Sequence, residues 1–229
     1  MANPFYDALA LLIPLVLAIV FHEVAHGWTA RALGDPTAAE MNRLSLNPFR
    51  HVDPVGTVIL PGFLALVKAP VFGWAKPVPV NQWRLRNPRF GMMLVAAAGP
   101  GMNLLMALVS VVLLGLLLQP YADAEPVGLA RFAMDNLVNF LKINVFLALF
   151  NLLPIPPFDG SHILEGLLPD GAARAYASLR QYGFLLVIGL IVVLPSLIPG
   201  FDPVGAIIDK PFAWVMEQYL AVLKSLVGA

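Results

Sequence analysis

The first apolar stretch of the chain, residues 5–30, reads FYDALALLIPLVLAIVFHEVAHGWTA. It is longer than the roughly 20 apolar residues that an α-helix needs to cross the hydrocarbon core of a bilayer. It also carries two histidines and a glutamate, which are costly inside a membrane and are therefore usually kept there for a function. The stretch predicts a membrane-spanning helix that holds a polar site.

The composition of the whole chain agrees with a membrane protein. Of its 229 residues, 59% are hydrophobic and 12% are charged, with a mean hydropathy of +0.79. A soluble domain has about 45–50% apolar and about 25% charged residues. The net charge of zero argues against a nucleic acid as the main partner. There is no cysteine, so a metal ion would have to be held by His, Asp or Glu.

Three further segments are long and apolar enough to cross the bilayer. The sequence therefore predicts an all-α integral membrane protein, a polytopic helix bundle that forms one membrane-embedded domain over residues 1–229. The expected spans are residues 5–30, 91–118, 136–153 and 183–199. The shorter stretch 55–67, with two glycines and a proline, is expected to be re-entrant. Residues 204–228 predict an amphipathic helix that lies at the interface, packs on the bundle or crosses the membrane.

The basic residues predict the orientation. Eight of the fourteen lie between the first two spans: Arg31, Arg43, Arg50, Lys68, Lys76, Arg84, Arg86 and Arg89. The loop at 119–135 instead carries three acidic residues and one arginine. Because loops rich in Lys and Arg stay in the cytoplasm, we expect the N-terminus outside, residues 31–90 inside, and the polar site toward the cytoplasmic side.

The polar site in the first span has the H-E-x-x-H pattern, from His22 to His26. Histidines at positions i and i+4 share one helix face, so both can bind one ion, and Glu23 can act as a general base. The alternative is that the histidines only pack between helices. Since three ionisable groups within five residues cost on the order of several kcal/mol in a membrane helix, a metal site is favoured.

A third metal ligand is expected from residues 151–160, which read NLLPIPPFDG. Asn151 and His22 each lie fourteen residues, about 21 Å, beyond the expected outer part of their spans, so they reach a similar depth. The three prolines then break the helix, and the irregular backbone can turn Asp159 toward the metal. The alternative is an ordinary turn at the end of a span.

These motifs together resemble a known family. H-E-x-x-H in an apolar span, followed by N-x-x-P-x-x-x-x-D-G at 151–160, resembles the site-2 protease family of intramembrane zinc metalloproteases. Residues 98–103 resemble its G-P-x-x-N element. Residues 53–57 and 73–80 resemble a compact bacterial and archaeal branch, in which no PDZ or CBS domain is expected.

The resemblance implies that His22, His26 and Asp159 bind one Zn²⁺ per chain. It further implies that Glu23 is the catalytic base and that Asn151 helps to hold the substrate carbonyl. The expected substrate is a membrane-spanning or membrane-associated protein, cut by regulated intramembrane proteolysis in a prokaryotic cell membrane, with a regulatory membrane partner. Two alternatives remain open: a catalytically silent scaffold that binds client helices, and a zinc or proton transporter.

Residues 70–80 alternate bulky side chains with small residues and prolines. Prolines suit only an edge strand, and an edge strand can pair with an extended substrate. The segment is therefore a candidate substrate-binding edge strand; the alternative is a proline-rich interfacial loop.

Four other polar residues are assigned from the sequence. His51 is expected to cap a turn or line the substrate entrance rather than bind the metal. His162 either orients Asp159 or lies on the surface. Asn103, with Gly99 and Gly101, is expected to serve close helix packing rather than chemistry. Lys142, near the outer end of the third span, can extend toward the interface, so no functional role is expected for it.

Overall fold

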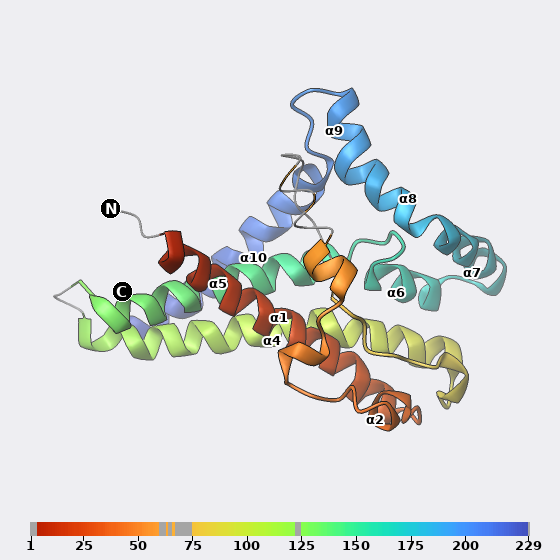
Figure 1. The fold of residues 1–229 in the computed structure, drawn as a ribbon, viewed down its shortest axis with the longest axis horizontal. Helices are drawn as coiled ribbons and strands as arrows, with labels where there is room; N and C mark the ends of the chain where they lie inside the picture. The colour runs from red at the N-terminus through yellow and green to blue at the C-terminus, as the bar shows by residue number, and fades with distance from the viewer. Residues whose placement is uncertain (1–3, 60–62, 64–65, 67–74, 122–124, 229) are drawn as a thin grey trace.

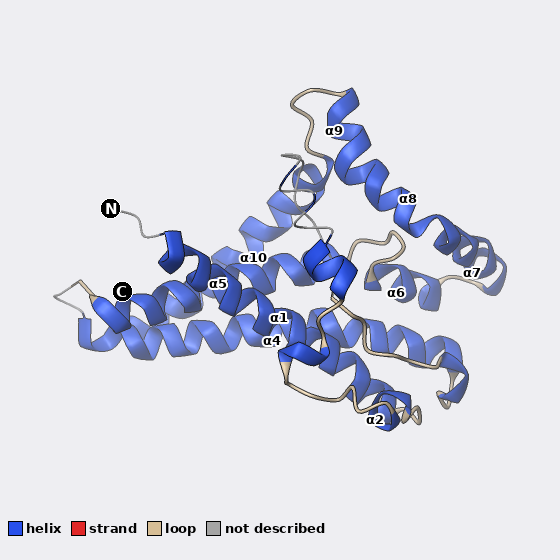
Figure 2. Cartoon of the chain, in the orientation of Figure 1, coloured by secondary structure: helices blue, strands red, loops and turns tan. Residues whose placement is uncertain are grey.

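The structure is a computed structural model that describes residues 4–59, 63, 66, 75–121 and 125–228. Its described residues form helices, turns and loops without a strand, which confirms the all-α prediction (Figure 2). The α-helices are α1 (Pro4–Ala32), α2 (Thr37–Glu40), α4 (Pro88–Leu118), α5 (Gly128–Asn151), α6 (Asp159–Leu167), α7 (Asp170–Ala177), α8 (Gly183–Ile188), α9 (Leu194–Leu197) and α10 (Pro203–Val227). A π-helical segment, Gly189–Val193, joins α8 to α9.

The centre of the molecule is a bundle of α1, α4 and α5, with α10 packed against α4 and α5. Its apolar core includes Ala107 and Val111 of α4 and Leu141 and Val145 of α5, all nearly or fully buried. Side chains of α10 cover this cluster, and the Tyr219 hydroxyl donates to the Leu104 carbonyl (2.7 Å). Of the three placements predicted for residues 204–228, the structure therefore shows packing on the bundle.

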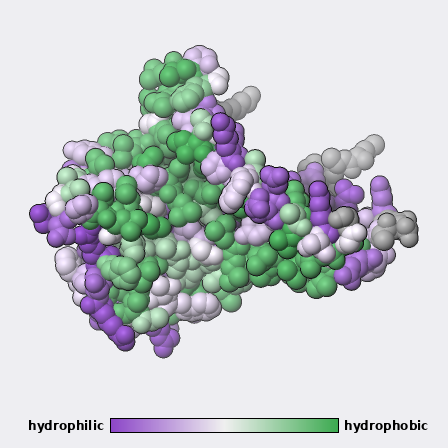
Figure 3. Space-filling view, turned by 180° about the vertical axis from the view of Figure 1, so that it is seen from behind, coloured by the Kyte–Doolittle hydropathy of each residue, from purple (hydrophilic) through white to green (hydrophobic). Residues whose placement is uncertain are grey.

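Four helical segments are long and apolar enough to cross a membrane: Phe5–Ala32, Pro88–Tyr121, Gly128–Asn151 and Asp170–Leu197. They correspond to the four predicted spans and confirm a multi-pass membrane protein. Apolar residues cover the middle of the face in Figure 3, and hydrophilic residues gather toward its two ends. In Figure 1 both termini and the α4–α5 connection lie at one end, and α2 and α7 lie at the other.

The third span begins earlier than predicted. Residues 128–135 belong to α5, although their charges had excluded them from the apolar segment. Arg131 and Asp135 pair one turn apart, and the Tyr6 hydroxyl of α1 donates to Asp135 (2.7 Å). Lys142 is consequently nine residues from the nearer end of α5, about 14 Å along the helix. The prediction that Lys142 lies near the outer end of its span was wrong.

Two hydrogen bonds fix the register of α1 against α5. Tyr6 bonds Asp135, and the Asn139 amide donates to the Ala10 carbonyl (2.8 Å), so both pairs are 129 residues apart. The same offset places Asn151 level with His22, the depth expected from the sequence.

Two short predicted features are described only in part. Of the re-entrant stretch 55–67, residues 54–59 form a π-helical turn, and most of the rest lies outside the described residues. Of the edge strand 70–80, residues 70–74 lie outside them. Residues 75–80 have no regular secondary structure and pair with no strand, so the described half is a loop. Two prolines there remove the N–H groups that a ladder requires.

Candidate metal centre

The three predicted metal ligands meet in the structure. His22 and His26, one turn apart on α1, are 7% and 9% exposed, and their Nε2 atoms are 3.1 Å apart. Asp159 is the first residue of α6. Its Oδ2 atom lies 3.1 Å from His22 Nε2 and 3.4 Å from His26 Nε2. Among the described residues, these three form the one group of three or more metal-binding side chains.

Asp159 reaches the histidines because the chain folds back after α5. At Gly160 a side chain would collide with the carbonyl groups of Leu152 and Leu153. Glycine therefore allows the first turn of α6 to pack directly on the end of α5. The prolines and the glycine of residues 151–160 thus serve one purpose, which is to return the carboxylate to the level of α1.

The hydrogen bonds of the imidazoles determine which nitrogen carries the proton. His26 Nδ1 faces the Val95 carbonyl at 2.7 Å. A carbonyl only accepts hydrogen bonds, so Nδ1 carries the proton. His22 Nδ1 lies 2.6 Å from Asn103 Oδ1. The Asn103 amide nitrogen already donates to Ala18 and Asn144, so Oδ1 is the acceptor and His22 Nδ1 is also protonated. Both Nε2 lone pairs are left for a metal.

This arrangement fits a cation. The two Nε2 atoms, which are unprotonated in the neutral imidazoles, and the Asp159 Oδ2 atom, which is buried and receives no hydrogen bond, stand 3.1–3.4 Å apart. Three lone pairs at that distance repel one another unless a positive charge lies between them. Tetrahedral zinc, with bonds of about 2.0–2.1 Å, places its ligand atoms about 3.3–3.4 Å apart. The donor set therefore fits one zinc ion, with an open position for catalysis.

Gly99 of α4 makes room for the two imidazoles. A Cβ atom at this position would lie 2.5 Å from His26 Nε2 and 2.6 Å from His22 Cε1. Gly101, two residues on, has no atom within 4 Å of such a position. Gly99 was expected to serve close helix packing, and the structure shows in addition that any side chain there would enter the metal centre.

Asn103 has a function that the sequence analysis missed. Asn103 lies between packed helices, as expected, but its fully buried amide also links α4 to three partners: His22, Ala18 of α1 and Asn144 of α5. Such partners orient a metal-binding histidine and fix its tautomer. A polar residue in the middle of an apolar span was the signal that could have revealed it.

Replacing Asn103 with leucine should therefore weaken zinc binding by about 10–100-fold, since His22 would lose its orienting acceptor. Zinc titration against a competing chelator measures the effect. The matched control is Ser110→Ala, because Ser110 is equally buried on α4 but donates only to Ala107 of its own helix. Equal zinc affinity in the two variants would contradict the assigned role of Asn103.

Glu23 is held by a distant loop. The backbone N–H of Val78 donates to Glu23 Oε2 (2.7 Å), which places residues 75–80 beside the histidines. The buried Arg43 guanidinium fixes this loop by donating to the carbonyls of Lys76 (2.8 Å) and Pro77 (3.3 Å). Gly27 permits the close approach, since a Cβ atom there would meet the Val78 side chain at 2.8 Å.

Asn151 lies at the end of α5 with its amide nitrogen 3.0 Å from the Leu147 carbonyl. A carboxamide has two N–H groups, so one is used within the helix and one remains. The structure thus brings Asn151 to the depth of His22 but shows it bonded within its own helix.

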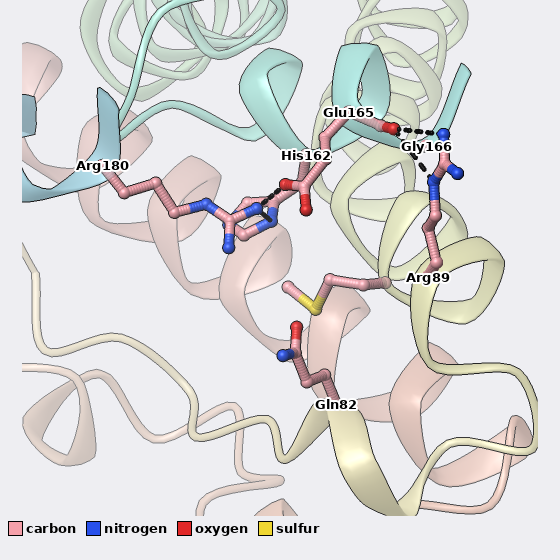
Figure 4. Close-up of a pocket in the computed structure, with 7 residues that line it drawn as sticks. Gln82, Arg89, His162, Glu165, Gly166 and Arg180 are labelled. Carbon is pink, nitrogen blue, oxygen red and sulfur yellow. Dashed lines mark hydrogen bonds and ion pairs between the residues drawn. The ribbon is translucent and has the colours of Figure 1, made fainter. Parts of the chain in front are cut away.

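His162 bonds Arg180 rather than Asp159. Its Nδ1 atom accepts from the Arg180 guanidinium (3.1 Å), which also pairs with Glu165, as Figure 4 shows. Burial and the neighbouring Arg180 lower the pKa of His162 to about 4. Arg89 of α4 donates to the Glu165 backbone carbonyl (2.9 and 3.1 Å). Arg89 therefore holds α6, and with it Asp159, against α4 of the bundle, whereas Arg180 ties α6 to the segment that follows α7.

His51 is buried outside the metal centre. It is 3% exposed, with Nε2 2.8 Å from the Ser45 carbonyl, and its own carbonyl accepts from the Lys76 N–H (2.9 Å). It therefore supports the loop that reaches Glu23, in agreement with the expectation that it is not a fourth ligand.

Comparison with known proteins gives consistent results. The family model of Peptidase family M50 matches residues 124–195, which contain Asn151 and Asp159. The Bacillus subtilis protein described as "Putative zinc metalloprotease YwhC" is 38% identical over 183 residues, 80% of each chain. Two further relatives are also described as putative zinc metalloproteases. Rip2 of Mycolicibacterium smegmatis is 30% identical over 77% of this chain and 64% of its own length. MJ0611 of Methanocaldococcus jannaschii is 30% identical over 71% of this chain and 74% of its own length. No solved structure matches the chain.

Proposed function

Because the chain belongs to peptidase family M50 and is a zinc metalloprotease, we propose that it hydrolyses peptide bonds of membrane-spanning or membrane-associated proteins within the bilayer. The observation that carries the proposal is the meeting of His22, His26 and Asp159 at membrane depth. A soluble substrate would not need a site placed about 15 Å from the inner end of α1, ten residues before Ala32.

In this proposal His22, His26 and Asp159 hold one zinc ion. When bound, zinc supplies Lewis-acid polarisation of a carbonyl and lowers the pKa of a water molecule to about 7. Glu23 takes the proton from the attacking water and passes it to the leaving amine. The Val78 N–H donates to one oxygen of Glu23. This hydrogen bond fixes the orientation of the carboxylate and leaves its other oxygen to take the proton.

Asn151 stabilises the substrate carbonyl as negative charge develops on its oxygen. The amide N–H that is not donated to Leu147 is the donor we assign to this role. Loss of one such donor typically lowers kcat by about 10²–10³-fold. Asn151 lies at the same depth as His22, which supports the assignment, because the N–H donor and the metal must face the same peptide group.

The substrate must lose its helical hydrogen bonds before its peptide bonds can react. Residues 75–80, which lie beside Glu23 and are held by Arg43, offer backbone groups with which an unwound substrate segment could pair. We therefore assign to this loop the substrate-holding role expected of the edge strand. The basic residues of this region support a site that faces the cytoplasmic side of a prokaryotic cell membrane, where cleavage would release a cytoplasmic fragment in regulated intramembrane proteolysis.

The test is cleavage of a single-span reporter by the purified chain in lipid vesicles. We expect about one zinc per chain, loss of cleavage when a chelator removes the metal, and recovery when zinc is returned. The uncut reporter alone and the chelator-treated chain without added zinc are the controls. Cleavage that persists in metal-free protein would refute the proposed reaction.

A further inference from the structure

We propose that an open groove between α1, α5 and α10 binds the transmembrane helix of the substrate through a carboxamide side chain, Asn or Gln, on that helix. The inference rests on the proposed function and explains how the protease selects its substrate. The groove is lined by helices α1 and α5, which also carry His22 and Asn151, and it contains ionisable groups that the proposed reaction does not use.

The groove encloses about 580 Å³ and is mostly apolar. Its apolar lining includes Leu15 of α1, Ile143 and Leu147 of α5, and Ile208 and Phe212 of α10. Such a surface suits a membrane helix, which offers apolar side chains and close van der Waals packing.

Three ionisable residues also line the groove: Lys142, Asp202 and Asp209. Asp202 caps α10 by accepting from the N–H groups of Val204 and Gly205. Lys142 and Asp209 are exposed and form no ion pair within the described part of the chain. Because Lys142 is about 14 Å from the nearer end of its span, it is too deep to be explained by extension to the interface. An unpaired charge at the depth of Lys142 is functional by default.

Two of the helices that line the groove also carry residues of the metal centre. Leu15 precedes His22 by seven residues, so it lies on the same face of α1 and about 10 Å outward. Leu147 precedes Asn151 by one turn and accepts its amide hydrogen. About three residues in extended conformation, at about 3.3 Å each, span 10 Å. A helix seated in the groove could therefore unwind for about three residues and place the next peptide bond at the metal.

The charges of the groove define its partner. Lys142 can only donate hydrogen bonds and the Asp209 carboxylate can only accept them. A carboxamide is neutral, so it enters a bilayer more easily than a charged side chain, and it can accept from Lys142 while donating to Asp209. Neither an apolar side chain nor a single charge would satisfy both groups.

The absence of cysteine from the chain permits a direct test with introduced cysteines. The host is the Glu23→Gln variant in phosphatidylethanolamine–phosphatidylglycerol vesicles, so that binding is read without cleavage. Ile143→Cys reports on the groove. Leu105→Cys is the matched control, because Leu105 is exposed on α4 at a similar depth, two residues beyond Asn103. The probe is a leucine–alanine transmembrane peptide of about 23 residues with one cysteine and a central asparagine, joined by a bismaleimide.

We expect at least about tenfold more cross-linking at Ile143→Cys than at Leu105→Cys. This is the difference in binding expected from two interhelical hydrogen bonds, one with Lys142 and one with Asp209. Exchanging the asparagine of the peptide for leucine, or adding Lys142→Met with Asp209→Ala, should remove this preference. Equal yields at the two cysteines, or a preference that survives both exchanges, would overturn the proposal and indicate a groove filled by lipid. Failure of the proposed reaction would appear separately, as absent cleavage by the chain with Glu23 intact.

Discussion

Replacing Gly99 with alanine should remove zinc from the protein. The added methyl group would lie 2.5–2.6 Å from atoms of both metal-binding imidazoles, closer than non-bonded atoms approach. Structural zinc in zinc-finger peptides is bound with about 10–16 kcal/mol in all, shared among its ligands, so displacing two of three ligands here should weaken binding by more than about 10³-fold. Zinc content after dialysis, and zinc affinity by chelator competition, measure the loss.

The control for this prediction is two residues away. Gly101→Ala adds the same methyl group to the same helix, where nothing lies within 4 Å, so zinc content and cleavage should stay at the level of the unaltered chain. If both variants lost helicity or thermal stability, the loss of zinc would have to be attributed to a disturbance of α4 itself. A Gly99→Ala protein that still bound zinc with full affinity would show that Gly99 does not face the metal centre.

Replacing Glu23 with glutamine should abolish most cleavage without loss of zinc. Glutamine has nearly the same shape, and its carbonyl oxygen can still accept the Val78 N–H that Glu23 Oε2 accepts at 2.7 Å, so the loop at 75–80 should stay in place. It cannot take a proton, and general base catalysis contributes about 10²–10⁴-fold. Single-turnover cleavage of the vesicle-bound reporter gives the rate, and zinc content is read from the same preparation.

Two further variants delimit the role of Glu23. Asp159→Ala should lose zinc as well as cleavage, because it removes a ligand rather than the base. Glu217→Gln changes an exposed carboxylate of α10 and should alter neither. If Glu23→Gln cleaved at the rate of the unaltered chain, the base would have to be another residue.

The sequence by itself determined the spans and the ligand types. Apolar length is a local property, so four spans were predictable, and the charged start of α5 was missed because length and hydropathy cannot see the bond from Tyr6 to Asp135. His22, Glu23 and His26 were predictable because helical spacing alone places both histidines on one face. Asp159 followed from the prolines that end the preceding helix.

Only the tertiary structure decided what surrounds these residues. Gly99 and Asn103 act on histidines more than 70 positions earlier in the chain, and Val78 reaches Glu23 across 55 residues. No periodicity records such contacts, because they depend on how helices cross and how a loop returns. Lys142 shows the same limit. Its depth follows from where α5 begins, and its lack of a charged partner among the described residues is evident only once α1 and α10 form the groove around it.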